Sequence, residues 1–393
     1  MPDLPVVIVG GLHADARRAA VARLLADVPG SVVLHHDLAT APAGTVVRTV
    51  SDAGGVLATG EAPLVDDCAC CALREDLVPE LARLARGGVT PLAIVELWDS
   101  VEPRAMAEVI VSGGLRLTAV ITAVDPALLL PYLANGDDLA ERGLAAAPTD
   151  RRTVADTFAR QLEYAPVLAI TDSPEADDED RELLTQLHPT AHRIPVEPPI
   201  PTPSPESPKP PQPPQNTQQP PPPTPSLHTP RTPLTPQTPC TPLTPLTETA
   251  IAPTARFDVD AAAAAQHPAC ALLPAEADAH GVGTLVWHRR RPFHPERLYA
   301  ALEDLTCAAV RSRGRFWLAD RPDTLLHWDA AGGALCVETA GPWLASLPDA
   351  AWDLVPPTRR AAAALDWHPE HGDRCQHLVP HHQTGRRSPT FDA

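Results

Sequence analysis

Residues 5–27 read PVVIVGGLHADARRAAVARLLAD, and this stretch decides the fold. Its first part, Val6 to Val9, is a continuous apolar run of the kind that forms a strand buried on both faces of a sheet. Two glycines, Gly10 and Gly11, follow at once, and the pattern from about Ala14 to Asp27 is that of a helix. A buried strand that turns through glycines into a helix is typical of a doubly wound α/β domain.

The same alternation of apolar runs and helical stretches continues to about residue 190. Further strand-like runs are Ser31–Leu34, Pro91–Val95, Leu117–Val124 and Val167–Ile170. Strands that alternate with helices of this length predict a mostly parallel sheet with helices on both faces. In such a fold the ligand site lies beyond the carboxyl ends of the strands. We therefore expect the chemistry in the loops that follow these runs.

The composition changes abruptly after this region. Residues 191–255 are dominated by proline with Thr, Ser and Gln, which predicts a disordered, partly polyproline-II spacer. The alternative is a ligand for an SH3-like domain. Residues 256–379 predict a small α+β domain, and residues 380–393 a frayed tail. In the α+β domain we expect strands at 283–288, 314–319, 324–328 and 376–379, and a helix at 295–306.

The bulk composition limits the function classes. The net charge of −18 predicts repulsion of nucleic acid phosphate, so DNA binding is not expected and RNA contact needs a local basic patch. Neither a signal peptide nor an apolar run long enough to span a membrane is apparent. Three of the eight cysteines fall within four positions, a spacing that favours metal binding or redox chemistry over disulfides. We expect a cytoplasmic protein without membrane contact.

The loop after the first strand resembles a P-loop that has lost its key side chains. A P-loop needs Gly, four residues, Gly, Lys and then Ser or Thr. The matching residues are Gly11, Ala16, Arg17 and Arg18. Arg17 keeps a positive charge, but Arg18 cannot ligate magnesium as a hydroxyl would. Two interpretations stay open: a plain turn that binds no nucleotide, and residual nucleotide binding through the helix N-terminus and Arg17.

The cysteine cluster lies in the run Cys68-Ala-Cys-Cys-Ala-Leu-Arg74. Cys68, Cys70 and Cys71 can converge on one soft ion, with His, Glu or water as the fourth ligand. Arg74 and the helix expected near Glu75 would lower the thiol pKa values and favour thiolates. We predict a metal site, zinc first. Buried structural cysteines and a redox pair are the alternatives.

Two acidic loops follow the second and third strands. Asp37 ends the run His35-His36-Asp37, while Glu96, Asp99 and Glu102 follow the third strand. These residues can hold magnesium or lend a metal ligand, or they can be caps and solvated loop residues. The Asn-Lys-x-Asp motif that reads guanine in GTPases does not follow the fifth strand. GTP hydrolysis is therefore left open.

The C-terminal domain carries a basic set among aromatic residues. Its members alternate at strand spacing, which predicts that they line one face as a phosphate-facing stripe for RNA or a partner. The alternative is ordinary solvated surface. The set consists of Arg289, Arg291, Arg311, Arg313 and Arg315.

Together, these motifs resemble the CobW-type GTPases and zinc metallochaperones. The Gly-Gly loop, the Cys68–Arg74 run and Ser100-Val-Glu-Pro103 carry the resemblance in the first domain, and 290–297 and 313–319 carry it in the second. It implies a P-loop NTPase-like fold, zinc at the three cysteines, and a site for GTP or GDP. The degenerate nucleotide site would comprise Gly10, Gly11, Ala16, Arg17, Arg18, Asp37 and Glu102.

Trp98–Pro103 and Trp367–Arg374 look most like an actinobacterial branch described as ribosome hibernation factor-recruiting GTPases. That resemblance implies a protein that brings a hibernation factor to the ribosome under zinc limitation, and it is our first hypothesis. A zinc metallochaperone that delivers zinc to target proteins is the second. A non-catalytic zinc sensor or storage module is the third.

Overall fold

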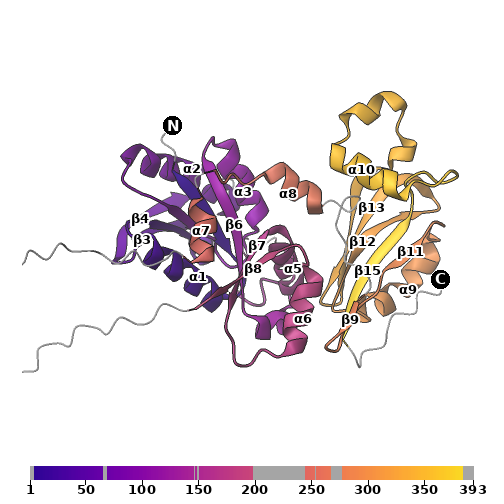
Figure 1. Cartoon of the computed structure of the whole chain (residues 1–393), viewed down its shortest axis with the longest axis horizontal. Coiled ribbons are helices and arrows are strands. Elements are labelled where there is room, and N and C mark those ends of the chain that lie inside the picture. The colour runs from indigo at the N-terminus through magenta and orange to yellow at the C-terminus, as the bar shows by residue number, and fades with distance from the viewer. Residues whose placement is uncertain are drawn as a thin grey trace, which may run out of the picture.

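A computed structural model of the chain describes residues 4–64, 69–145, 147, 150–197, 244–252, 254–266 and 277–383. Figure 1 shows an N-terminal domain built on one sheet beside a C-terminal domain built on another. Within the described residues, no helix is long and apolar enough to cross a membrane.

The N-terminal sheet has the order β4-β3-β2-β5-β1-β6-β7-β8. Neighbours from β2 to β8 are parallel, and β3 and β4 add an antiparallel hairpin at one edge. The predicted fold class, a mostly parallel α/β sheet followed by a small α+β domain, is confirmed. The strands are β1 (Pro5–Gly10), β2 (Val32–Asp37), β3 (Thr45–Asp52), β4 (Gly55–Pro63), β5 (Ala93–Glu96), β6 (Arg116–Val124), β7 (Val167–Thr171) and β8 (His192–Val196).

Helices cover both faces of this sheet because successive residues of its buried strands point to opposite sides. Val6 and Ile8 of β1 belong to one core, with α2 and α3, whereas Val7 and Val9 belong to the other, with α1 and α7. The helices of this domain are α1 (Ala14–Asp27), α2 (Ala69–Gly87), α3 (Pro103–Ser112), α4 (Leu129–Leu133), α5 (Val154–Tyr164), α6 (Asp178–Leu187), α7 (Pro245–Ile251) and α8 (Val259–Gln266), with the 3-10 turns η1 (Leu38–Ala43) and η2 (Pro126–Leu128).

The proline-rich segment does not begin and end where the sequence predicts. Strand β8 pairs with β7, and helix α7 buries Leu246 and Ala250 in the core beside α1. Thr244 caps α7 and Pro245 is its first residue, a start signal that the surrounding prolines obscure. The spacer prediction for 191–255 is therefore wrong at both ends. Residues 198–243 lie outside the described residues.

The C-terminal domain is an antiparallel sheet in the order β14-β13-β12-β15-β10-β9, with β11 also on β15. The single strand predicted at 283–288 is two strands, β10 and β11. The elements of the C-terminal domain are β9 (Ala277–Ala279), β10 (Val282–Thr284), β11 (Trp287–Arg289), α9 (Pro295–Cys307), β12 (Arg311–Leu318), β13 (Arg321–Ala331), β14 (Ala334–Pro342), η3 (Leu344–Ser346), η4 (Asp349–Leu354), α10 (Pro357–Asp366) and β15 (Gln376–Gln383).

Strand β15 continues past residue 379, where the sequence predicts its end. It pairs with β12 through His381 and with β10 through Gln383. His381 is fully buried, so the frayed-tail prediction is wrong for the start of 380–393. Pro380 misleads here because proline is rare inside central strands. Residues 384–393 lie outside the described residues.

Candidate metal and nucleotide site

The turn from β1 into α1 places the degenerate P-loop at the carboxyl end of the sheet. Gly11 has φ +125°, and a Cβ at this position would lie 2.6 Å from the Ala123 carbonyl oxygen. Only glycine accepts this backbone and this close approach to β6. The turn is therefore a built feature of the fold, whether or not a ligand binds there.

The Arg17 guanidinium lies between the turn after β1 and the carboxyl end of β5. The side chain is 6% exposed; it donates from Nη1 to the Gly11 carbonyl at 2.5 Å and from Nη2 to Asp99 at 2.5 Å. Its Nε lies 3.3 Å from Glu96 Oε1. Glu96 and Asp99 are two of the four acidic residues that the sequence offers for a magnesium ion. In this structure a fixed cation from α1 neutralises both.

The middle of the loop turns into the protein instead of outward. His13 is 2% exposed and packs against the rings of both Tyr132 and Phe158. Its Nδ1 accepts a hydrogen bond from the Asp125 amide at 2.9 Å. Burial lowers the pKa of His13 to about 3, so the imidazole is neutral near pH 7. A phosphate-cradling loop would present this segment to the ligand.

The other predicted nucleotide residues do not point into one ligand site with Arg17. Gly10 ends β1 and Ala16 is buried under the sheet, while Arg18 is exposed and pairs with Asp15. Asp37 accepts the Ala39 amide at 2.9 Å and so caps the turn η1. With no hydroxyl at residue 18 and both acids paired to Arg17, the described residues do not fit magnesium–GTP.

Within the cysteine motif, only Cys71 has a described side chain. It is half-buried in the first turn of α2. Cys68 and the side chain of Cys70 lie outside the described residues, so the convergence of the three sulfurs stays a prediction. The positive end of a helix stabilises thiolates, which suits a thiolate metal site at this position.

Helix α2 is anchored close to the cysteine motif. Leu73, Leu77 and Leu81 are buried in the core between α2 and the sheet. Asp76 accepts hydrogen bonds from Arg48 Nη1 at 2.6 Å and 2.8 Å and contacts His36 Nε2 at 2.8 Å. His36 lies in β2, not in a loop after it as the sequence predicts. These contacts hold Asp76, and with it the start of α2, against β2 and β3.

Comparison with known proteins bears on both domains. Residues 52–200 match the CobW/HypB/UreG nucleotide-binding domain, and residues 282–379 match the cobalamin synthesis protein cobW C-terminal domain. The zinc chaperone Rv0106 of Mycobacterium tuberculosis is 30% identical over 391 residues, covering 94% of this chain and 81% of the relative. The chain belongs to the CobW family.

Two further relatives are more distant. The zinc-regulated GTPase metalloprotein activator 1 of Dictyostelium discoideum is 23% identical over 338 residues, covering 79% of this chain and 60% of that protein. The crystal structure of Zn(II)-bound YjiA GTPase from E. coli aligns over 98% of this chain and 96% of that one, with 12% identity and a TM-score of 0.32. The nucleotide-domain match in this CobW-family chain begins at residue 52, after the altered loop.

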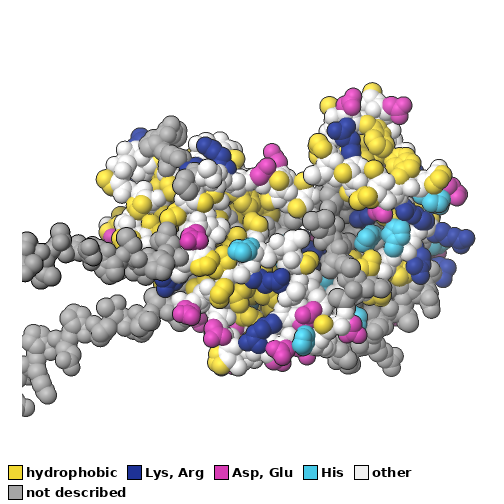
Figure 2. All heavy atoms as spheres, viewed as in Figure 1, with side chains coloured by type: hydrophobic (Ala, Val, Ile, Leu, Met, Phe, Trp, Pro, Cys, Tyr) yellow, Lys and Arg dark blue, Asp and Glu magenta, His cyan; other side chains and the backbone are white. Residues whose placement is uncertain are grey.

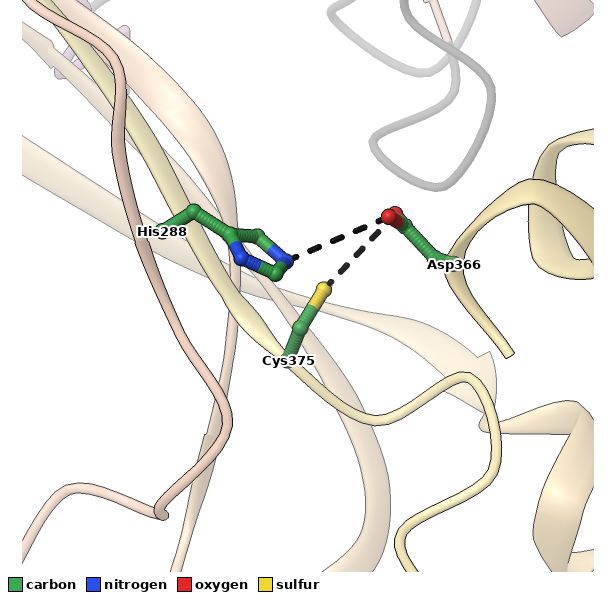
Figure 3. A group of neighbouring side chains, drawn as sticks. All are labelled: His288, Asp366 and Cys375. Carbon is green, nitrogen blue, oxygen red and sulfur yellow. Dashed lines mark hydrogen bonds and ion pairs between the residues drawn. The ribbon is translucent and has the colours of Figure 1, made fainter. Parts of the chain in front are cut away.

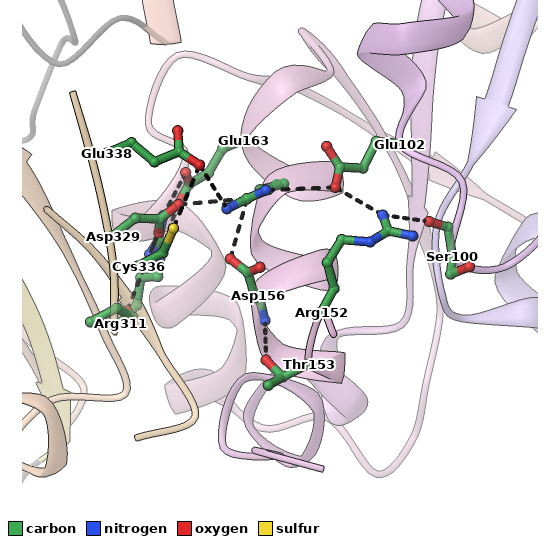
Figure 4. Close-up of polar contacts among 12 residues, drawn as sticks. Ser100, Glu102, Arg152, Thr153, Asp156, Glu163, Arg311, Asp329, Cys336 and Glu338 are labelled. Atoms are coloured by element: carbon green, nitrogen blue, oxygen red, sulfur yellow. Dashed lines mark hydrogen bonds and ion pairs between the residues drawn. The ribbon is translucent and has the colours of Figure 1, made fainter. Parts of the chain in front are cut away.

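In this CobW-family protein, Glu102 belongs to a polar network between the two domains (Figure 4). Arg152 donates to Glu102 at 2.9 Å and to the Ser100 carbonyl at 3.1 Å. Arg160 lies within 4.0 Å of Glu102 on one side and of Asp329 and Glu338 of the C-terminal domain on the other. The loop after β5 is thus tied to the C-terminal sheet. The predicted role of Glu102 in nucleotide binding has no support in these contacts.

The predicted basic stripe is wrong for its three β12 members. Arg311 is 1% exposed and donates to both carboxylate oxygens of Glu163 on α5, at 2.8 and 2.9 Å, and to Asp329. Arg313 also pairs with Glu163, at 3.4 Å, and Arg315 pairs with Asp366. Strand spacing places the three on one face, but that face is occupied by acids. Arg289 and Arg291 are exposed. Figure 2 shows Lys and Arg side chains beside His side chains on the surface of the C-terminal domain.

The Glu163 carboxylate predicts how stability depends on pH. Burial opposes its charge, but Arg311 and Arg313 outweigh burial and hold the pKa of Glu163 at about 2, against 4.5 ordinarily. Because the folded pKa is depressed, this stabilisation is present above about pH 4.5 and is lost as pH falls towards 2. We expect a slope of up to about 1.4 kcal/mol per pH unit in that window.

Urea titrations at pH 5, 4, 3 and 2 measure this slope. The Glu163→Gln variant should be less stable than the parent at pH 7 and should show a shallower slope between pH 4.5 and 2. A parallel decline of both proteins with pH would contradict the assignment to Glu163.

Proposed function

We propose that this CobW-family protein is a zinc chaperone that works without magnesium–GTP turnover. It takes zinc as cargo at Cys68, Cys70 and Cys71 and passes the ion to a zinc-dependent target protein. The observation that carries the second half of this proposal is the Arg17 guanidinium between Glu96 and Asp99. The relative named as a zinc chaperone and the half-buried Cys71 at the start of α2 support the first half.

A motif of three thiolates suits transfer of an ion better than permanent storage. Zinc sites that use three protein ligands keep a fourth position open for an incoming group. A thiolate of the target can enter there, and stepwise exchange of sulfurs then moves the ion while the leaving cysteines regain protons. The half-buried position of Cys71 at a helix start leaves its sulfur partly accessible to such a partner.

Recruitment of a hibernation factor to the ribosome stays a prediction. A basic stripe in an otherwise acidic chain is one observation that supports this hypothesis. Its members Arg311, Arg313 and Arg315, however, form ion pairs with Glu163, Asp329 and Asp366. The contacts therefore favour zinc delivery over ribosome binding. The sensor or storage hypothesis differs from delivery in one measurable respect, because it predicts no transfer to an acceptor.

We expect Cys71→Ser to reduce the zinc affinity of the motif by roughly tenfold or more, because a hydroxyl is a much poorer zinc ligand than a thiolate. Competition with a chromophoric chelator measures the affinity. The matched control is Cys307→Ser, which removes an exposed cysteine at the end of α9 and should leave affinity unchanged. Equal affinity in the parent and in Cys71→Ser would exclude Cys71 as a ligand.

We expect no saturable binding of magnesium–GTP below about 1 mM, a concentration that corresponds to roughly −4 kcal/mol. Titration with a fluorescent GTP analogue measures it. Zinc transfer to a metal-free acceptor protein should proceed at the same rate with and without GTP. The recovery of the acceptor's activity measures this rate. Micromolar GTP binding, or transfer that requires GTP, would overturn the nucleotide-independent mechanism.

A further inference from the structure

Three side chains of metal-ligand type converge in the C-terminal domain, far along the chain from the cysteine motif. His288 lies on β11, Asp366 ends α10, and Cys375 directly precedes β15. Their ligand atoms all lie within 4.8 Å of one another. Figure 3 shows the imidazole and the thiol pointing at the same carboxylate.

The spacing of these atoms suits one small cation. His288 Nε2 lies 3.9 Å from Asp366 Oδ1, and Cys375 Sγ lies 4.0 Å from Asp366 Oδ2. Zinc bonds of about 2.0 Å to nitrogen or oxygen and 2.3 Å to sulfur place tetrahedral ligand atoms roughly 3.3–3.8 Å apart. Every pair of ligand atoms lies within 4.8 Å, so the three side chains would need to close by at most about 1 Å to reach this spacing.

The imidazole nitrogen that faces the carboxylate has no hydrogen-bond partner in the part of the chain that the structure describes. His288 Nε2 is buried from solvent and makes no hydrogen bond among the described residues. A neutral imidazole offers the lone pair of this nitrogen to a metal ion. Buried polar atoms nearly always have a partner, so this nitrogen is available as a ligand for a metal ion. Cys375 is fully buried beside it.

The scaffold that holds the three ligands is rigid. In the β11–β15 pairing, His288 lies opposite His377. The Gln376 side chain accepts from the Trp317 amide at 3.0 Å and donates to the Arg291 carbonyl at 2.9 Å. The Asp373 carboxylate accepts from two backbone amides, at 2.9 Å each, and fixes the loop before Cys375. Ligands on well-held elements form preorganised sites.

The three ligands themselves can offset the charge of a divalent cation, while two arginines hold the carboxylate. Arg315 pairs with Asp366 Oδ2, and Arg290 lies 3.9 Å from Oδ1, so two guanidinium groups orient the carboxylate. One divalent cation with a thiolate, a carboxylate and a neutral imidazole forms a neutral unit. Arg315 can keep its contact to Oδ2 while Oδ1 turns to the ion, an arrangement typical of outer-sphere support for metal ligands.

We propose that His288, Asp366 and Cys375 bind one Zn²⁺ or a similar thiophilic divalent cation at a second site. On binding, the Cys375 thiol releases its proton to solvent and sulfur bonds to the metal. Three protein ligands leave a fourth position for water or an incoming group. The ion would fasten α10 to the sheet through β11 and β15. This site does not depend on the chaperone function proposed for the cysteine motif.

The experiment uses the full chain with Cys68, Cys70 and Cys71 all replaced by serine. Cobalt(II) serves as the spectroscopic probe, because thiolate ligation gives a near-ultraviolet charge-transfer band. We expect one cobalt per chain with this band, and its loss when zinc is added. Cys375→Ser in this background should abolish the band, and His288→Ala should weaken binding by roughly tenfold or more.

The matched control in the same background is Cys336→Ser, which removes a half-buried cysteine of β14 and should leave the band intact. Circular dichroism checks the fold of each variant. If Cys375→Ser fails to fold, the half-buried His288 decides, since its truncation is expected to be tolerated. No cobalt band in the serine background, or a band unchanged by His288→Ala, would overturn the proposal. Either result leaves the zinc affinity of the cysteine motif, and hence the proposed function, untouched.

Discussion

Replacing Arg311 with alanine is expected to lower the free energy of unfolding by about 4 kcal/mol. The guanidinium is 1% exposed and joins the domains by donating to both carboxylate oxygens of Glu163 and to Asp329. Its removal leaves Glu163 to Arg313, at 3.4 Å, and Asp329 to Arg160, at 3.6 Å, and the incompletely compensated buried charge is the main cost. Urea unfolding followed by tryptophan fluorescence measures the loss.

Two comparisons separate the charge effect from simple loss of packing. Arg311→Met combined with Glu163→Gln removes both charges and should recover part of the stability lost in Arg311→Ala. Arg297→Ala on α9 removes an exposed arginine and should change stability by less than about 0.5 kcal/mol. A loss below about 1 kcal/mol in Arg311→Ala would show that the interdomain pair contributes little.

Much of the fold follows from the sequence because its signals are local. The apolar run Val6–Val9, the glycine turn and the helical period of 14–27 specify β1 and α1 with the observed bounds of the helix. The hairpin of β3 and β4 lacks such a signal, since much of β4 is exposed and its side chains are mixed. The burial of His381 depends on β10 and β12, which lie far away in sequence.

The candidate sites divide in the same way. Dense spacing marks the cysteine motif, and comparison with a consensus marks the altered P-loop, so both are visible in the sequence. The ion pairs of the β12 arginines are not visible in the sequence, because Glu163 and Asp366 reach these arginines only through tertiary packing. His288, Asp366 and Cys375 come from three separate segments, and no spacing rule connects them. Arginine spacing predicted a shared face correctly but could not predict what covers it.

Replacing Arg17 with alanine is expected to cost about 3 kcal/mol, the lower end for a broken buried ion pair. Glu96 and Asp99 are 17% and 25% exposed, so water can screen part of the exposed charge. Arg17→Lys should lose less, because an ammonium keeps the charge but not the three-pronged geometry. Thermal unfolding, with Arg18→Ala as the control for an exposed arginine, measures these differences.

The same variant tests whether Arg17 takes the place of a metal cation. Without its guanidinium, Glu96 and Asp99 present two carboxylates at the strand ends, a ligand pair that suits magnesium. Millimolar magnesium should therefore raise the melting temperature of Arg17→Ala and leave the parent unchanged, since only the variant offers a vacant acid pair. An equal response of both proteins to magnesium would mean that the guanidinium does not occupy the cation position. A selective response would explain how this P-loop kept its backbone after its lysine and hydroxyl were gone: a side chain from α1 supplies the charge that the acids require.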